Sequence, residues 1–290
     1  MAAERGFEGP ADLHLHSHES DGTQSPAAVM EAVHRHGIRT SALTDHDTTS
    51  GWAEAAEAAA SLGMTFLPGM ELSTTTGWRS VHLLAYLFDP DAPGLRAEVR
   101  RIREARLGRA ARIVRNISRD YDLTWDDVVA AHQEGATIGR PHIADALVAR
   151  GLARDRTDAF DGILHPGGDY YVGHYTADSL NAVRLIVEAG GVPIFAHPAA
   201  RGRMLPPDVL DELIAAGLAG FEVGHRENTA AGRRSLERLA AHHDLIVTGS
   251  SDYHGAGKPN LPGEHTTSDD MVQRIIERGT GSAPVYPSGR

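Results

Sequence analysis

The stretch Asp12-Leu13-His14-Leu15-His16 decides the fold, because it ends the first apolar run of the chain in side chains that can bind a metal. Side chains alternate along a strand, so the two imidazoles project from the same face. Later apolar runs also end beside such groups: Asp45 and His46, Glu71, His197, and Asp252 with His254. Strands that present polar side chains at their carboxyl ends are typical of β/α-barrel enzymes. Imidazoles and carboxylates without thiols suit zinc, manganese or iron, so the sequence predicts a metal-dependent hydrolase.

The composition is that of an ordinary globular protein. Hydrophobic residues make up 41% and charged residues 23% of the 290 residues, which fits one large barrel or a barrel with a small inserted unit. No apolar stretch approaches the ~20 residues that cross a membrane, and the N-terminus lacks the apolar core of a signal peptide. Cysteine is absent, which excludes disulfides and leaves His, Asp and Glu as metal ligands. We therefore expect a cytoplasmic location.

The net charge of −11 at pH 7 limits the partners that we expect. Proteins that bind a long polyanion usually carry a basic face, so neither long nucleic acid as an obligate partner nor a membrane is expected. Divalent cations would cancel carboxylate charge locally, and a small phosphorylated substrate is therefore compatible with an acidic chain. Nothing in the sequence indicates an oligomeric state.

Seven segments are predicted to form strands, and helical patterns lie between most of them. The predicted strands are 11–15, 39–44, 64–70, 80–88, 192–196, 219–224 and 245–250. Strands that alternate with helices predict a parallel sheet, which we expect to close into a barrel rather than to stay open.

The alternation stops between residues 91 and 177. The pattern there predicts a long basic helix at 95–119 and shorter helices near 125–133, 141–150 and 156–164. The arginines of the long helix are interpreted as a solvated face in preference to an anion-binding platform. We expect a metal-binding barrel over 1–90 and 178–290, and a helical insertion over 91–177 that covers the active site.

The motifs, taken in their order, resemble those of the polymerase-and-histidinol-phosphatase (PHP) family of metal-dependent phosphoesterases. They are Asp12-x-His14-x-His16, Ser20-Asp21-Gly22, Thr44-Asp45-His46-Asp47, Gly69-x-Glu71-x-Ser73, Ala196-His197-Pro198 and Ser251-Asp252-x-His254. The resemblance covers 11–88 and 183–256. It implies a distorted seven-stranded, TIM-like β/α barrel with two to three divalent metal ions, which are manganese, zinc or iron.

The same resemblance implies a ligand set for each cation. The first cation would use His14, His16, Glu71 and Asp252; the second Glu71, His82 and His197; and the third Asp21, His46 and His254. Glu71 would then bridge the first two cations, whereas Asp47 would lie outside the set of ligands.

Two stretches of the predicted insertion, Gly139-Arg140-Pro141-His142 and 166–172, resemble the stand-alone bacterial branch of the family. That branch hydrolyses nucleoside phosphates, including nucleoside 3′,5′-bisphosphates, and in some members short RNA from its 5′ end. We therefore expect a metal-activated hydroxide to hydrolyse a phosphate monoester of a small nucleotide. The expected catalytic residues are Glu71, Asp252, His225 and Arg140, and the expected substrate-binding residues are Arg140, His142 and Arg201.

Several alternatives stay open at this point. Within the same chemistry they are a 5′–3′ exonuclease on short oligonucleotides and a histidinol phosphatase. A barrel hydrolase of C–N bonds is a further alternative, since His-x-His also marks amidohydrolases, and a non-catalytic PHP module is another. Lys258 is the only lysine of the sequence and is expected on a loop beyond the metal ligands, which excludes a carboxylated lysine in a strand.

Overall fold

The computed structural model describes residues 9–130, 138–173, 175–202 and 204–287. Its central sheet joins seven strands in the order β1, β2, β3, β4, β6, β7, β8, and β5 pairs with β3 outside that path. The strands are β1 (Ala11–Asp12), β2 (Thr40–Leu43), β3 (Thr65–Thr76), β4 (Arg79–Tyr86), β5 (Ala177–Asp178), β6 (Val192–Phe195), β7 (Gly220–Gly224) and β8 (Ile246–Gly249).

The two ends of this sheet meet just beyond β1 and β8. Leu15 and Tyr253 form a parallel bridge, and the backbone N–H of His16 donates to the Tyr253 carbonyl oxygen at 2.9 Å. Asp12 adds a second link, because its carboxylate accepts the backbone N–H groups of Ser251 and Gly263. The expected distorted seven-stranded barrel is thereby confirmed, and it is nearly closed.

One expectation about the sheet is wrong: it is not parallel throughout. β4 runs antiparallel to both β3 and β6. Only Gly77 and Trp78 separate β3 from β4, and a turn of two residues can join antiparallel strands but not parallel ones. Gly77 has φ of 59°, which the primed turns of such hairpins require. The hairpin also extends β3 to Thr76, so Glu71 lies within the strand and His82 lies opposite Ser73.

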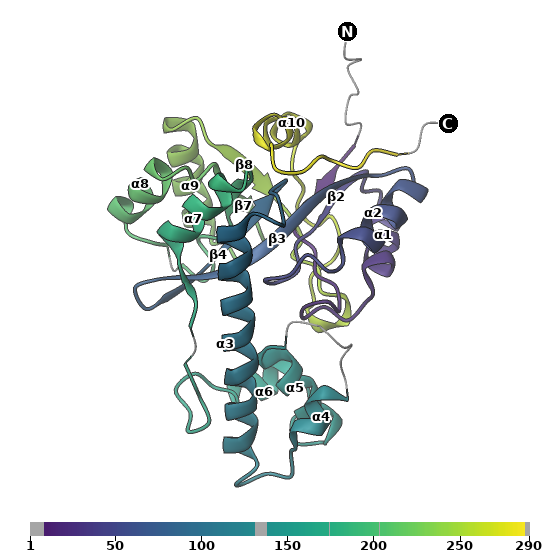
Figure 1. Ribbon diagram of the computed structural model, residues 1–290, viewed down its shortest axis with the longest axis vertical. Coiled ribbons are helices and arrows are strands. Elements are labelled where there is room, and N and C mark those ends of the chain that lie inside the picture. The colour runs from purple at the N-terminus through teal and green to yellow at the C-terminus, as the bar shows by residue number, and fades with distance from the viewer. Residues whose placement is uncertain (1–8, 131–137, 174, 203, 288–290) are drawn as a thin grey trace.

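Six helices pack around the barrel (Figure 1). They are α1 (Pro26–Arg35), α2 (Trp52–Ser61), α7 (Ser179–Glu188), α8 (Pro207–Ala215), α9 (Ala230–His242) and α10 (Asp269–Arg278). α1 begins where expected, since the Ser25 side chain accepts the N–H of Ala28 and Pro26 fixes the first turn. One apolar cluster fills the barrel and extends to α10, and others lie under α1–α2 and under α7–α9.

The chain between β4 and β5 contains α3 (Pro93–Ile117), α4 (Trp125–Val129), α5 (Arg140–Ala149) and α6 (Arg156–Asp161). α3 runs away from the sheet, and the three short helices lie beside its far half (Figure 1). Leu95 and Ile102 pack with the barrel core, whereas the far half shares a separate core with α4–α6. The predicted helix 125–133 ends outside the described residues. Among the described residues, no helix combines the length and apolar character that a membrane span requires.

Candidate metal centre

Glu71 stands at the middle of a cluster of imidazoles, and its two oxygens face different members of it. Oε2 lies 3.2 Å from Nε2 of His14, 3.1 Å from Nε2 of His16 and 3.3 Å from Nδ1 of His46. Oε1 lies 2.7 Å from Nδ1 of His82 and 3.3 Å from Nε2 of His197. His46, Glu71 and His82 also form a cluster whose atoms are close enough to share an ion, so Glu71 could serve more than one cation.

Asp252 completes the first of these groups. Its Oδ1 lies 3.5 Å from Nε2 of His14 and 3.4 Å from Nε2 of His16, and those two nitrogens are themselves 3.0 Å apart. The three side chains form one of the clusters whose atoms are close enough to share an ion. Asp252 has φ of 55°, so the backbone after β8 takes a left-handed turn that points this carboxylate back over the barrel.

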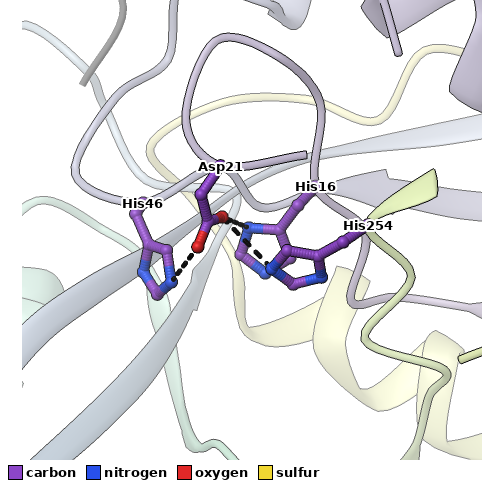
Figure 2. Close-up of side chains that lie close together, drawn as sticks. All are labelled: His16, Asp21, His46 and His254. Carbon is purple, nitrogen blue, oxygen red and sulfur yellow. Dashed lines mark ion pairs between the residues drawn. The ribbon is translucent and has the colours of Figure 1, made fainter. Parts of the chain in front are cut away.

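Asp21 forms the centre of a second cluster, between three histidines (Figure 2). Its Oδ1 lies 3.1 Å from Nε2 of His254 and 3.6 Å from Nδ1 of His16, and its Oδ2 lies 3.8 Å from Nε2 of His46. Nδ1 of His254 donates to the carbonyl oxygen of Asp252 at 2.8 Å, which leaves Nε2 free to face Asp21. The structure thus brings together all nine residues that were expected to bind metal.

Most pKa shifts of the cluster suit divalent cations. Burial works against the charge on Glu71 and Asp21, but the surrounding histidines hold the pKa of each carboxyl well below its usual range. Burial lowers the pKa of His16 to about 4 and the pKa of His46 well below its usual value. Burial also opposes the charge on His14, but Glu222, Glu71 and Asp252 raise its pKa well above the usual value. Ionised carboxylates and neutral imidazoles are the states in which these groups bind metal, so a cation bound at His14 would displace a proton.

Several buried polar atoms of the cluster lack a hydrogen-bond partner among the described residues. They are Nδ1 of His46, Oδ1 of Asp252, Nε2 of His254 and Nε2 of His225. An unsatisfied buried donor or acceptor costs about 1–3 kcal/mol, and bound cations would remove that cost from the atoms that face them. The residues present therefore fit a site for divalent metal ions.

Glu222 is a functional candidate that the sequence interpretation missed. It is fully buried in β7, and its Oε1 accepts a hydrogen bond from Nδ1 of His14 at 2.9 Å. Its Oε2 accepts the backbone N–H of His197 at 2.8 Å. The hydrogen bond between Glu222 and Nδ1 of His14 orients the ring so that Nε2 faces the cluster. Carboxylates orient metal-binding histidines in this way. A carboxylate in the otherwise apolar strand 220–224 was the available indication.

Asp45 supports the loop that carries Asp21. Its carboxylate accepts the Ser17 N–H at 2.8 Å and the Ser17 and Ser20 hydroxyls at 2.6 Å each. Burial raises the pKa of Asp45 to about 6 in spite of these donors. Asp45 therefore orders residues 17–20 instead of facing the cluster itself.

The insertion touches the same loop. Nη1 of Arg156 in α6 donates to the Asp21 carbonyl oxygen at 3.0 Å, while the other guanidinium nitrogens form a bidentate pair with Asp145. His142 is buried in α5, and its Nδ1 accepts the N–H of Gly139 at 2.8 Å. Burial lowers the pKa of His142, although Asp21 and a hydrogen bond with the Ser20 backbone oppose that shift.

Three arginines of the insertion lie close to one another. Arg106 pairs with Asp47 (Nε to Oδ2, 2.8 Å) and contacts Ser73. Burial and the nearby charge of Arg140 lower the pKa of Arg109 to about 10. Nη1 of Arg140 is buried without a hydrogen-bond partner in the described part of the chain. The interpretation of the long helix as a solvated face is therefore wrong for Arg106, which reaches Asp47 of the barrel, and for Arg109, which donates to the Val172 carbonyl oxygen of the insertion.

Of two further residues expected in the site, His225 lies beside the cluster and Arg201 does not. His225 is buried beside the cluster: its Nε2 lies 3.4 Å from Oδ2 of Asp252, and its Nδ1 accepts the N–H of Glu227 at 3.2 Å. Nε2 is then the nitrogen that holds the proton. Arg201 is exposed, and its guanidinium pairs with Glu227 at 3.3 Å, away from the clusters. The structure does not bring Arg201 to the candidate centre.

Lys258 lies on a loop, as expected, but not beyond the ligands. Its Nζ is 2.8 Å from Oδ2 of Asp252. Burial opposes the charge, yet Asp252 and Asp21 raise the pKa of Lys258 above its usual value, so the ammonium is charged at neutral pH. Sequence reasoning missed this approach because the five residues between Asp252 and Lys258, which include a 3₁₀ turn at Gly255–Gly257, carry no pattern that predicts the path of the chain.

A barrel whose strand ends gather buried imidazoles and ionised carboxylates in this way belongs to the metal-dependent hydrolases, and comparison with known proteins agrees. A family model described as the PHP domain matches residues 12–147. A 3′,5′-nucleoside bisphosphate phosphatase of Chromobacterium violaceum is 35% identical over 92% of this chain and 95% of its own length. The chain therefore belongs to the PHP family.

Two further relatives extend the comparison. A crystal structure from Bifidobacterium adolescentis, described as a candidate metal-dependent phosphoesterase, superposes with a TM-score of 0.91 at 42% identity and covers 95% of this chain and 98% of that one. A 5′-3′ exoribonuclease of Haemophilus influenzae is 32% identical over 84% of this chain and 89% of its own length.

Proposed function

We propose that the chain is a metal-dependent phosphatase that hydrolyses a phosphate monoester of a small nucleotide, either a nucleoside 3′,5′-bisphosphate or a nucleoside monophosphate. The observation that carries this proposal is the position of Glu71, whose two oxygens face two groups of imidazoles. The bisphosphate phosphatase of C. violaceum, similar over nearly the whole chain, supports the substrate class.

The proposed ligands are those implied by the motifs, in two or three sites, with manganese, zinc or iron as the metal. Divalent cations supply charge neutralisation on phosphoryl oxygens and lower the pKa of bound water from about 15.7 toward about 7. The chain itself orients these groups: Glu222 holds His14, and Lys258 holds Oδ2 of Asp252, with His225 3.4 Å from the same oxygen. His225 keeps a proton at Nε2 beside Asp252, and it is our candidate to protonate the leaving oxygen.

The helical insertion, residues 91–177, is proposed to cover the site and to select the substrate. Its arginines supply positive charge next to an otherwise acidic centre, and the guanidinium of Arg140 stands at the start of α5. A helix N-terminus and a guanidinium both favour an anion. A second phosphate of a bisphosphate, or the neighbouring phosphate of a short RNA, is the proposed occupant.

Replacing Arg140 with alanine tests that role. We expect kcat/KM for a nucleoside 3′,5′-bisphosphate to fall. The corresponding loss of transition-state stabilisation is about 2–4 kcal/mol, the cost of truncating one partner of a buried charge pair. The loss with p-nitrophenyl phosphate should be much smaller, because that ester has no second phosphate. Steady-state kinetics on both substrates measure the difference.

Arg154→Ala is the matched control, since Arg154 is exposed and pairs only with Asp158 among the contacts described. Equal losses on both substrates would place Arg140 at the reacting phosphate. No loss on either would make it structural.

The function itself is tested by measuring phosphate release with manganese-loaded protein. The substrates are a nucleoside monophosphate, a nucleoside 3′,5′-bisphosphate, histidinol phosphate and a short 5′-phosphorylated oligonucleotide. We expect the highest kcat/KM with the bisphosphate. An exonuclease cleaves phosphodiester bonds and releases nucleoside monophosphates, so these products are measured for the oligonucleotide. Their release at a clearly higher kcat/KM than phosphate release from the bisphosphate would favour the exonuclease alternative, which the relative of H. influenzae supports. If no ester released phosphate under manganese or zinc, the proposed function would be wrong.

Two weaker alternatives remain for the same centre. Histidinol phosphate would be hydrolysed by the same chemistry, but it has no second phosphate for the insertion arginines. A substrate hydrolysed at a C–N bond need not carry a phosphate, so this alternative would give the insertion arginines no anion to bind. A cytoplasmic location, which the cysteine-free sequence favours, is part of the same proposal.

A further inference from the structure

Lys258 places a permanent positive charge at the edge of the candidate metal centre. Its Nζ lies 2.8 Å from Oδ2 of Asp252, and 39% of its side chain remains exposed, whereas only 6% of the Asp252 side chain is exposed. The ammonium therefore contacts a buried carboxylate, while part of the lysine side chain stays exposed. An ammonium has three donors, and the contact with Asp252 uses one of them.

The two oxygens of Asp252 have different surroundings. Oδ1 faces the imidazoles of His14 and His16 and has no hydrogen-bond partner in the described part of the chain. Oδ2 lies between Nζ of Lys258 and Nε2 of His225, at 2.8 and 3.4 Å. Lys258 thus contacts the oxygen that does not face the cluster, so a cation bound at Oδ1 would leave this ion pair in place.

The turn that carries Lys258 is held on both sides. Thr23, in the loop of Asp21, accepts the backbone N–H of Ala256 at 2.8 Å. On the other side the guanidinium of Arg156 lies close to Gly257: a Cβ there would be 2.3 Å from Nη1, so a larger residue would displace that side chain. Asn260 donates to the Ser251 carbonyl oxygen at 2.7 Å beyond the lysine. A side chain fixed in this manner is positioned before any ligand arrives, which lowers the cost of binding.

We propose that Lys258 is a phosphate-binding residue, whose ammonium contacts the reacting phosphate of the substrate while it holds Asp252 in place. The inference rests on the proposed phosphatase function and adds to it a residue outside the motif set. A phosphate dianion is the ligand that fits best, because the ammonium has two donors left and lies 2.8 Å from Asp252, a member of the cluster at which the ester must lie. Lysine is also suited to this role, as a compact charge that needs no fixed angle to the oxygen.

The alternative role for Lys258 is purely structural, in which it only orients Asp252. The two roles predict different results for Lys258→Met, which removes the charge and keeps an unbranched stem. Loss of a phosphate contact should weaken the binding of inorganic phosphate and leave the bound metal unchanged. Loss of orientation alone should reduce the bound metal and leave the phosphate affinity of fully loaded protein unchanged.

The experiment measures the Kd of inorganic phosphate by calorimetry on manganese-loaded protein, together with manganese per chain by elemental analysis. For Lys258→Met we expect the phosphate Kd to rise about 10- to 100-fold, the usual range for a hydrogen bond to a charged group. Manganese content should match the wild type. Lys258→Arg, which keeps the charge, should recover part of the affinity, and Arg96→Met, at an exposed arginine that pairs with Asp91, should change neither quantity.

An unchanged phosphate Kd in Lys258→Met, with or without loss of manganese, would overturn the assignment. If the methionine variant does not fold, Lys258→Gln is measured instead, because its amide can still donate to Asp252 but carries no charge. Failure of the proposed function would look different, since the wild type itself would then neither bind phosphate nor release it from any ester.

Discussion

Replacing Glu71 with glutamine is expected to lower kcat/KM for a phosphate ester by about a thousandfold or more, which is at least ~4 kcal/mol. The carboxylate of Glu71 faces five imidazoles, three around Oε2 and two around Oε1, so its negative charge acts on both groups of histidines. Glutamine has nearly the same shape but offers one neutral oxygen in place of two charged ones. Steady-state kinetics with saturating manganese measure the loss.

Asp47→Asn is the matched comparison for this prediction. Asp47 is also buried and acidic, but its Oδ1 accepts the Ser73 N–H at 2.8 Å and its Oδ2 pairs with Arg106. It therefore connects the strand to α3 without facing the cluster, and its loss should cost far less activity. A folded Glu71→Gln protein with near-normal turnover would exclude the bridging role.

The strand-end pattern made much of this centre predictable from the sequence. In a barrel, the carboxyl ends of neighbouring strands meet on one face, so groups far apart in the chain such as His14 and His197 come together. Their rings are indeed stacked with centroids 5.9 Å apart. The same reasoning located β4 but gave it the wrong direction. The apolar pattern of a strand is the same in both directions, and the two-residue turn at Gly77 and Trp78 decides which one it takes.

Other parts of the centre could not be predicted, for a physical reason. Glu222 and Lys258 act through single contacts that depend on how loops and neighbouring strands pack, and neither belongs to a run of similar residues. The arginines of α3 posed the opposite difficulty, because one helix carries many of them and only tertiary contacts distinguish Arg106 from the exposed Arg96. A pattern identifies a face of an element, but it does not identify which neighbour will cover that face.

The purified protein is expected to hold two to three equivalents of transition metal, and His14→Ala combined with His16→Ala should remove most of it. Nε2 of both rings lies within 3.5 Å of Asp252 or Glu71, so the double variant deletes two donors from the most buried part of the cluster. His16 also faces Asp21, which couples the loss to the second cluster. Elemental analysis after growth with manganese or zinc measures the content of each protein.

The chain offers a control with the same spacing in His34 and His36, which lie at the end of α1 rather than in the barrel. His36 donates from Nδ1 to the Ala32 carbonyl oxygen, and neither ring belongs to a described cluster of metal-capable side chains. His34→Ala with His36→Ala should therefore keep the full metal content, which would show that position, and not the number of histidines, decides binding. Wild-type protein that stays free of metal under both supplements would contradict the site altogether.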